Sequence, residues 1–245
     1  RQVALGNEKE QDTAWMKYVE ACTIESKATT EPADIKIEVA RGGEYKIRLE
    51  DGTTVWLNSE SSLIYPEKFT GDKRAVRLSG EGYFEVARDE KKPFIVSVTD
   101  MEIKVLGTKF NVTAYQDEKM TTTTLISGAV EVVTPHRSVQ LQPGKQAMVQ
   151  EGGDDITVLE VDVELATSWT AGIFKFDKMA LTDICTRLSR WYDIDFVFEG
   201  ETGKEKFTGG TWKYVPLKDF LSKIERVTNV LFLFENNTVK VVPKK

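Results

Sequence analysis

The sequence has very few of the residues on which most metal and catalytic sites depend. Its 245 residues include one histidine, His136, and two cysteines, Cys22 and Cys185. A zinc site gathers several His or Cys ligands, and an activated nucleophile needs a base such as histidine beside it. His136 follows Pro135 in a turn-like stretch, so we interpret it as a solvated loop residue. Two distant cysteines exclude a disulfide framework and leave open only a single Cys22–Cys185 bridge.

A basic excess and a long apolar run are also missing. The formal net charge is -6, which argues against nucleic acid as the main partner, because phosphate binding requires a basic face. The longest bulky apolar run, residues 230–234, is far shorter than the roughly 20 residues of a membrane span. The chain begins at Arg1 and shows no signal-peptide pattern. We therefore expect a processed chain or a piece of a longer one.

The acidic residues do not form a convincing catalytic or metal set. A glycosidase needs two carboxyl groups a few ångströms apart across a cleft. Glu81, Glu85 and Asp51 are the candidates, but surface strands carry such residues without any catalytic role. Asp154 and Asp155 are too few for Ca²⁺, which takes six or more oxygen ligands. No glycine-rich loop opens a helix in the manner of a phosphate site. We predict no catalytic residue, no cofactor and no metal.

What the sequence does have is a long series of strand patterns between residues 35 and 160. Apolar and polar residues alternate at a period of two, as in half-buried strands. The form Leu-x-x-Gly occurs at Leu49, Leu125 and Leu141, and the apolar register slips by one residue around Gly107. A glycine at such a slip indicates a bulge or a tight bend. The pattern predicts a mainly β domain, either β-helix-like or a rolled antiparallel sheet.

The tail carries a different pattern, which occurs twice. Apolar residues at helical spacing begin at Leu181 and again at Leu217. Strand-like alternation follows each of them, from Ile194 and from Val230, at the same offset between the two copies. We predict an α+β domain consisting of a duplicated βαβ–βαβ unit, which forms one small sheet with two helices on one face.

These patterns divide the chain into four ranges. An apolar island over residues 15–19 suits either a short amphipathic helix or a single apolar turn in a linker. The predicted ranges are a linker or juxtamembrane segment at 1–34, an all-β domain at 35–160, a connector at 161–172 and the duplicated domain at 173–245.

The tryptophans are candidates for binding a sugar, but packing is the competing interpretation. The internal repeat places Trp191 and Trp212 at core positions, so we expect both to be buried. Trp169 precedes the tail. Trp56 lies on the opposite side of its strand from its apolar neighbours, where it either contacts a ligand or fills a second face of a rolled sheet.

A series of motifs runs through the β region into the tail. The motifs are Asp51-Gly52-Thr53-x-Val55-x-Leu57-Asn58-x-x-Ser61, Tyr65-Pro66-x-x-Phe69, Arg74-x-Val76-x-Leu78-x-Gly80-Glu81-x-Tyr83-Phe84-x-Val86, Pro93-Phe94-x-Val96, Val105-Leu106-Gly107-Thr108-x-Phe110-Asn111-Val112, Leu125-x-x-Gly128-x-Val130 and Trp169-x-x-Gly172-x-Phe174-x-Phe176. Together they resemble the FecR family, the extracytoplasmic part of transmembrane anti-sigma regulators in Gram-negative bacteria. The tail is similar to the short N-terminal domain of secretins and TonB-dependent receptors. Gly82 departs from the alanine usual in the family, but both residues are small.

The resemblance implies a β-helix-like fold for the β region and a regulator without catalytic residues. It also implies a cytoplasmic anti-sigma segment and one membrane span before Arg1, which would place these residues in the periplasm. The implied partners are the N-terminal signalling domain of a TonB-dependent outer-membrane transporter and, through the cytoplasmic segment, a sigma factor.

We place the transporter contact at the last strand, on Val239, Lys240, Val241 and Val242. A terminal strand is expected to leave an open sheet edge, which a partner strand can extend by β-augmentation. Proline at position 240 is then expected to abolish binding and leave the β domain folded. The alternative function is a secreted carbohydrate-binding module, which also uses strands and surface tryptophans but does not account for the duplicated tail.

Overall fold

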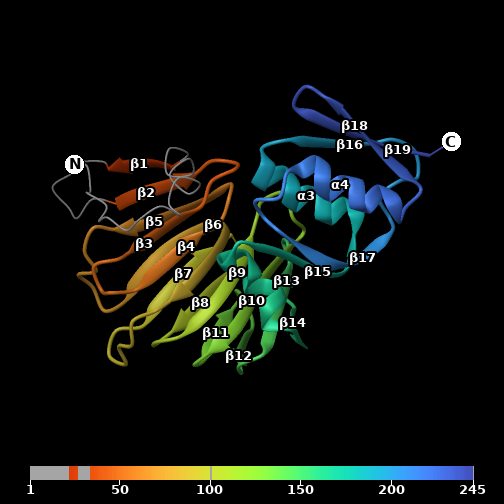
Figure 1. Cartoon of the computed structure of the whole chain (residues 1–245). Coiled ribbons are helices and arrows are strands. Elements are labelled where there is room, and N and C mark those ends of the chain that lie inside the picture. Colours follow the sequence, from red (N-terminus) through yellow and green to blue (C-terminus); the bar gives the residue numbers. More distant parts are fainter. Residues whose placement is uncertain (1–21, 27–33, 100, 245) are drawn as a thin grey trace.

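The computed structural model describes residues 22–26, 34–99 and 101–244. Figure 1 shows a large arrangement of strands beside a smaller unit of helices and strands that ends at the C-terminus. Within the described residues, no helix is both long enough and apolar enough to cross a membrane. The apolar island over residues 15–19 lies outside the described residues.

The large unit is a 14-stranded sheet that divides into two halves at strand β6 (Arg74–Glu85). The first part of β6 pairs with β5 (Ser61–Pro66) and β7 (Phe94–Val98). The second part, from Gly80 onward, pairs with β4 (Thr54–Leu57) and β9 (Lys109–Ala114). We call the two parts half-sheet A and half-sheet B.

The remaining strands extend both halves outward from β6. Half-sheet A also contains β1 (Cys22–Ser26), β2 (Asp34–Val39), β8 (Met101–Val105), β11 (Val130–Val133) and β12 (Ser138–Leu141). Half-sheet B also contains β3 (Tyr45–Arg48), β10 (Met120–Ser127), β13 (Lys145–Gln150) and β14 (Ile156–Glu160).

The chain passes repeatedly from one half-sheet to the other at glycine corners. Gly107 lies between β8 and β9, Gly128 between β10 and β11, and Gly144 between β12 and β13. Gly107, the glycine at the predicted register slip, therefore lies at a bend between the two half-sheets. Two of the three Leu-x-x-Gly segments, at Leu125 and Leu141, precede such corners, whereas the third makes the β3–β4 hairpin within half-sheet B.

The rolled antiparallel alternative describes the large unit, and the β-helix-like alternative is wrong. A solenoid would stack its successive coils as parallel strands. Here the only parallel pair among the described strands of the large sheet is β6 with β7, and every other pair is antiparallel. Hairpins within one half-sheet, such as β9–β10, β11–β12 and β13–β14, reverse the chain direction, and the glycine corners carry the chain on into the other half-sheet.

The two half-sheets enclose one hydrophobic core. Along β6 buried residues alternate with partly exposed ones, as a strand with one covered face requires. Phe84, Phe94 and Phe110 are fully buried, and the rings of Phe84 and Phe110 stack at 5.0 Å between centroids. Because β6 and β9 pair these two residues directly, the aromatic stack fixes the register of half-sheet B.

Two predicted connecting ranges contain regular structure. In the range 1–34, predicted as a linker or juxtamembrane segment, β1 pairs antiparallel with β2. The connector at 161–172 contains the helix α2 (Val163–Thr167) and the 3₁₀ helix η1 (Ser168–Ala171). The division of the chain into four domain ranges stays a prediction.

The C-terminal unit follows the predicted order of strand, helix and strand twice, but it forms two sheets instead of one. One sheet pairs β15 with β17, and the other has the order β16-β19-β18. Figure 1 draws the two helices between these sheets. Whether the halves superpose as a duplicated unit stays a prediction. The elements are β15 (Ile173–Ala180), α3 (Leu181–Tyr192), β16 (Asp195–Phe198), β17 (Lys206–Trp212), α4 (Leu217–Arg226), β18 (Val230–Glu235) and β19 (Thr238–Pro243).

The apolar faces of α3 and α4 form a second core, as the helical spacing predicts. Cys185 is buried there as a free thiol, so the Cys22–Cys185 bridge is absent, and burial raises the pKa of this thiol. Trp191 is buried, as expected, but Trp212 is 61% exposed. The repeat misplaces Trp212 because β15 and β17 form a ribbon of their own, in which Trp212 pairs with Ile173 at one end.

The open edge predicted for Val239–Val242 is wrong. Strand β19 is the central strand of its sheet, parallel to β16 on one side and antiparallel to β18 on the other. Val239 and Val241 are fully buried. A proline at Lys240 would therefore interrupt a central ladder and report on folding instead of docking. Contact of this segment with a partner stays a prediction, but strand addition has to occur at β16 or β18.

Candidate functional site

The large unit and the C-terminal unit meet at the C-terminal end of α3. The last carbonyl groups of a helix have no partner within the helix. Here Arg41, in the corner between β2 and β3, donates to the carbonyl oxygen of Ser189 at 2.9 Å and to that of Ile194 at 2.8 Å. The backbone N–H of Gly42 donates to the carbonyl oxygen of Arg190 at 2.7 Å. One corner of the large unit thus caps a helix of the other unit, and its cation complements the negative end of the helix dipole.

Arg190 makes the main ionic contact across this junction. Its side chain is 5% exposed, and it donates to Asp117 and to Glu118, each at 2.6 Å, in the turn between β9 and β10. Its guanidinium carbon lies 3.6 Å from the ring centroid of Tyr115. A guanidinium held by two carboxylates and an aromatic face has little freedom to reorient. These contacts therefore fix the orientation of α3 against the large unit, in addition to balancing the charge of Arg190.

A second cation, Lys213, is buried beside this junction. Its side chain is fully buried, and its Nζ contacts Glu44 and lies 3.7 Å from the ring centroid of Trp191. Two influences on its pKa oppose each other: the Glu44 carboxylate favours the ammonium form, and loss of hydration favours the neutral amine. Because the amine has no access to water while Glu44 is 27% exposed, desolvation dominates and holds the pKa of Lys213 well below its usual range.

This burial predicts a pH dependence of stability. In the unfolded chain the lysine keeps its proton up to a pKa of about 10.4, whereas the folded protein releases it at a lower pH. Between these two values the unfolded state binds more protons, so the free energy of unfolding should rise with pH. Urea unfolding of the wild type across this range should show the rise, and Lys213→Met should flatten it. Lys223→Met, on the exposed face of α4, should leave the slope unchanged; equal slopes in all three proteins would contradict the assignment.

A polar network attaches the connector to the outer face of half-sheet B. Trp169 is buried and donates its Nε1–H to Oδ1 of Asn111 at 3.1 Å. Asn111 Nδ2 donates to Glu81 at 3.0 Å, and Asn58 Nδ2 donates to the other oxygen of Glu81 at 2.7 Å. These four residues come from four separate sequence motifs. Their convergence explains why polar residues occupy these motifs without forming a catalytic group.

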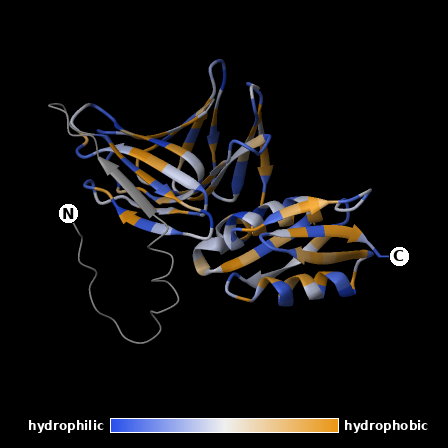
Figure 2. Cartoon of the chain, turned by 90° about the horizontal axis from the view of Figure 1, so that it is seen from above, coloured by the Kyte–Doolittle hydropathy of each residue, from blue (hydrophilic) through white to orange (hydrophobic). Residues whose placement is uncertain are grey.

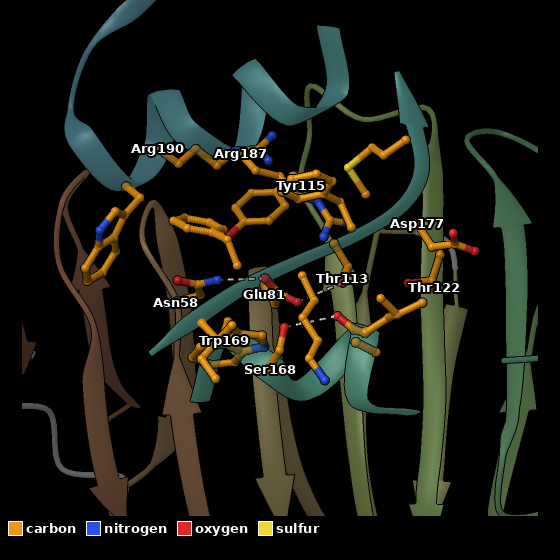
Figure 3. A pocket seen from close by; sticks show the side chains of 18 of the residues that line it. Asn58, Glu81, Thr113, Tyr115, Thr122, Ser168, Trp169, Asp177, Arg187 and Arg190 are labelled. Atoms are coloured by element: carbon orange, nitrogen blue, oxygen red, sulfur yellow. Dashed lines mark hydrogen bonds between the residues drawn. The ribbon is translucent and has the colours of Figure 1, made fainter. Parts of the chain in front are cut away.

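A cavity of about 200 Å³ lies between this network and the C-terminal unit. In Figure 3, Glu81, Thr113 and Thr122 approach it from the strands of half-sheet B, Ser168 and Trp169 from the connector, and Arg187 and Arg190 from α3. The two aromatic residues of β15, Phe174 and Phe176, are partly exposed and also line it.

The carboxylates considered for catalysis are not paired. Glu81 and Glu85 lie four residues apart on the same strand, a separation of roughly 13 Å along an extended chain. Glu85 is instead bound to Lys109 at 2.7 Å. Asp51 accepts hydrogen bonds from Thr53 and a buried ionic contact from Arg74 at 2.8 Å. Each acid therefore has a separate structural role.

The other sequence candidates behave as loop and packing residues. His136 has a side chain that is 81% exposed and contacts Asp154, which confirms the solvated loop. In the part of the chain that the structure describes, no group of three or more His, Cys, Asp or Glu side chains is placed to hold a metal ion. Trp56 lies on the outer face of half-sheet B, 5.3 Å from the ring of Tyr83 and 4.0 Å from Nζ of Lys46.

The outer face of the three-stranded sheet exposes apolar side chains around Lys240, which is paired with Glu235 at 2.8 Å. Leu233 and Leu231 of β18 are 45% and 37% exposed, and Val197 of β16 is 47% exposed. The sheet register places Val197 and Leu233 on either side of Lys240 in β19. In Figure 2 hydrophobic residues are prominent along these strands. Among the described strands, β16 and β18 each pair with β19 alone, so both outer edges of this sheet are unpaired.

Sequence reasoning missed the junction residues Arg41, Arg190 and Lys213. A basic residue in the last turn of a helix is ordinarily read as a solvated partner of the helix dipole. Only the docking of the two units buries Arg190. For the neighbouring polar network the sequence did offer a signal. Asn58, Glu81 and Trp169 occupy fixed positions in the motifs, although the exposed face of a strand accepts many different polar residues.

Comparison with known proteins gives a consistent result. A family model described as FecR protein matches residues 35–131, and one described as FecR, C-terminal, matches residues 173–241. The chain is also similar to two crystal structures, at 1.65 and 2.50 Å resolution, of a protein assigned as an anti-sigma factor from Parabacteroides distasonis ATCC 8503. Each has 30% identity and a TM-score of 0.80, and the match covers 86% of this chain and 99% or 100% of that chain. No curated protein matches the sequence.

Proposed function

This chain belongs to the FecR family of anti-sigma regulators, and we propose that it is the periplasmic part, which relays the occupancy of an outer-membrane receptor. In this proposal the receptor is a TonB-dependent transporter whose N-terminal signalling domain contacts the C-terminal unit. A sigma factor is controlled through a cytoplasmic segment and a single membrane span that precede Arg1. The chain acts by protein contact and converts no substrate.

The observation that carries the proposal is the exposed apolar face of the three-stranded sheet. A surface that joins Leu231, Leu233 and Val197 next to unpaired strand edges combines the two features that strand addition uses. Backbone groups at β16 or β18 provide hydrogen bonds, and the apolar side chains provide burial. We place the signalling domain here and no longer at the buried backbone of β19.

The junction supports the second half of the proposed relay. A receptor that contacts the C-terminal unit affects the large unit only if the two move together. The cap from Arg41 couples α3 to the β2–β3 corner of the large unit, and the ion pairs of Arg190 couple it to the β9–β10 turn. A force or rotation applied at the three-stranded sheet would therefore reach the large sheet, and through it the segment that precedes the described strands.

Replacement of Leu233 by lysine should prevent receptor binding. The lysine adds an unpaired charge beside Lys240, whose own charge is already paired with Glu235, and burying an unpaired charge is strongly unfavourable. The wild-type chain is first used as bait for outer-membrane extract, and a captured TonB-dependent transporter is identified by mass spectrometry. Its signalling domain is then titrated calorimetrically against both proteins. We expect the affinity to fall at least about a hundredfold in Leu233→Lys, the loss typical of a central contact residue.

The chain offers a closely matched control. Leu159 in β14, at the edge of half-sheet B, is 46% exposed, compared with 45% for Leu233. Leu159→Lys therefore makes the same chemical change on an edge strand of the other unit and should leave the affinity unchanged. Equal affinity of Leu233→Lys and wild type would reject this docking face, and failure of every TonB-dependent transporter to bind would reject the receptor.

A further inference from the structure

The cavity between half-sheet B and the C-terminal unit has no role in the proposed relay. We propose that it binds a small, uncharged, hydroxyl-rich ligand of about the size of one sugar ring. The inference does not depend on the identity of the receptor, because it rests on the cavity alone. It follows from the polar groups on one side of the cavity, the aromatic side chains on the other, and the state of the charged groups around it.

The side formed by half-sheet B carries a row of polar side chains. The sheet register pairs Glu81 directly with Thr113, and Thr113 directly with Thr122. Asn58 extends the row, since its backbone N–H donates to the carbonyl oxygen of Glu81 at 3.0 Å. Neighbouring strands are about 4.8 Å apart, so the row presents hydrogen-bonding groups at regular intervals across the cavity. Directly opposed residues face the same side of a sheet.

Several of these groups have hydrogen-bonding capacity left over. The hydroxyl of Thr122 has no partner among the described residues. The carboxylate of Glu81 accepts from Asn58, Asn111 and Thr113, whereas a carboxylate offers about four acceptor sites. The side-chain amide of Gln146 donates once, to Thr124 at 2.7 Å, and its oxygen is not used. A ligand with several hydroxyl groups would meet both donors and acceptors here.

The opposite side of the cavity is apolar and aromatic. Phe174 and Phe176 of β15 and Leu165 of α2 line it, and all three are partly exposed. The rings are held edge-to-face, Phe174 against Trp191 and Phe176 against Phe220. An apolar platform that faces a few directional polar groups is the usual composition of a ligand pocket. A sugar ring has both surfaces, with C–H groups on its faces and hydroxyl groups at its rim.

The charged groups around the cavity favour a neutral ligand. Arg190 is bound to Asp117 and Glu118, and Lys175 is bound to Glu164. These two cations are therefore compensated within the protein. Arg187 and Asp177 also line the cavity; both are exposed, neither forms an ion pair among the described residues, and they carry opposite charges. Within the described residues the carboxylate of Glu81 makes no ion pair and is held by three neutral donors. An anionic ligand would lie close to the carboxylates of Glu81 and Asp177, and a cationic ligand close to Arg187, whereas a neutral ligand meets no like charge.

Isothermal titration calorimetry of the 245-residue chain tests the proposal directly. The probes are D-glucose, D-galactose, D-mannose and N-acetyl-D-glucosamine, with D-glucuronate as the charged comparison. We expect at least one neutral probe to bind more tightly than D-glucuronate. Thr122→Val removes the free hydroxyl without a change of shape and should weaken binding about tenfold. Leu165→Trp fills the apolar side and should abolish binding.

The matched control is Thr157→Val on the exposed surface of β14, in the same half-sheet but outside the cavity. It should bind the probe with wild-type affinity. Thermal unfolding of each variant shows whether it is folded at the temperature of the titration. Absence of heat with every neutral probe would overturn the proposal. Binding that Thr122→Val and Leu165→Trp leave unchanged, while both remain folded, would overturn it as well, because the ligand would then sit elsewhere.

Discussion

Replacement of Gly80 by alanine should lower the free energy of unfolding by roughly 3–5 kcal/mol. Gly80 lies in β6 where this strand leaves half-sheet A and enters half-sheet B, and its φ is +93°, which L-residues with a side chain rarely adopt. A Cβ atom there would lie 2.7 Å from Cα of Ser61. That atom belongs to the backbone of β5, so it cannot move aside without disturbing the sheet. Urea unfolding followed by circular dichroism measures the loss.

Gly144 is the matched control for this substitution. Its φ is +83°, close to that of Gly80, but nothing lies within 4 Å of the position a Cβ would take. Gly144→Ala therefore places alanine at an unfavourable positive φ but causes no steric overlap. It should lower the free energy of unfolding by only about 1 kcal/mol. Equal losses in the two variants would show that the close approach to Ser61 does not matter, and that β6 can bend in another way.

Replacement of Arg190 by methionine should uncouple the two units. The change keeps an unbranched apolar stem but leaves Asp117 and Glu118 without their cation. Breaking a buried ion pair typically costs several kcal/mol; because Asp117 is 63% exposed and can be rehydrated, we expect about 2 kcal/mol here. Calorimetric unfolding should then show a separate transition of the C-terminal unit at lower temperature, and small-angle X-ray scattering should give a larger radius of gyration.

Arg187 provides the control on the same helix. It lies one turn before Arg190, is exposed, and forms no ion pair in the described part of the chain. Arg187→Met should change the free energy of unfolding by no more than about 0.5 kcal/mol, as is usual for a solvated surface residue. If both variants unfold in a single transition with the wild-type radius of gyration, the cap from Arg41 is sufficient to hold the units together.

The junction and the docking face together connect the two halves of the proposed relay. The exposed sheet face lies on one side of the C-terminal unit, and the C-terminal end of α3 lies at the contact with the large unit. Arg190→Met is therefore expected to leave receptor affinity close to that of the wild type, whereas Leu233→Lys abolishes it. The two variants separate recognition from transmission, which is the distinction that the proposal requires.

Local patterns in the sequence determined the elements. Alternation at a period of two identified the strands of the large unit, and the helical spacing from Leu181 and Leu217 identified α3 and α4, because burial of one face imposes these periods. The glycines in the Leu-x-x-Gly segments marked two corners and one hairpin turn, since few other residues accept positive φ. The spaced motifs identified the FecR family, which the comparisons confirmed.

Only the tertiary structure decided how these elements meet. A strand pattern shows which face is covered but not which neighbour supplies its hydrogen bonds, so the last strand, β19, was expected at an edge and lies in the centre of its sheet. The offset between the two tail patterns could not show that Trp212 ends an exposed ribbon. Nor could a basic residue at the end of a helix reveal that Arg190 is buried against two acids of a distant turn. These outcomes depend on contacts between residues far apart in the chain, and no local period encodes such contacts.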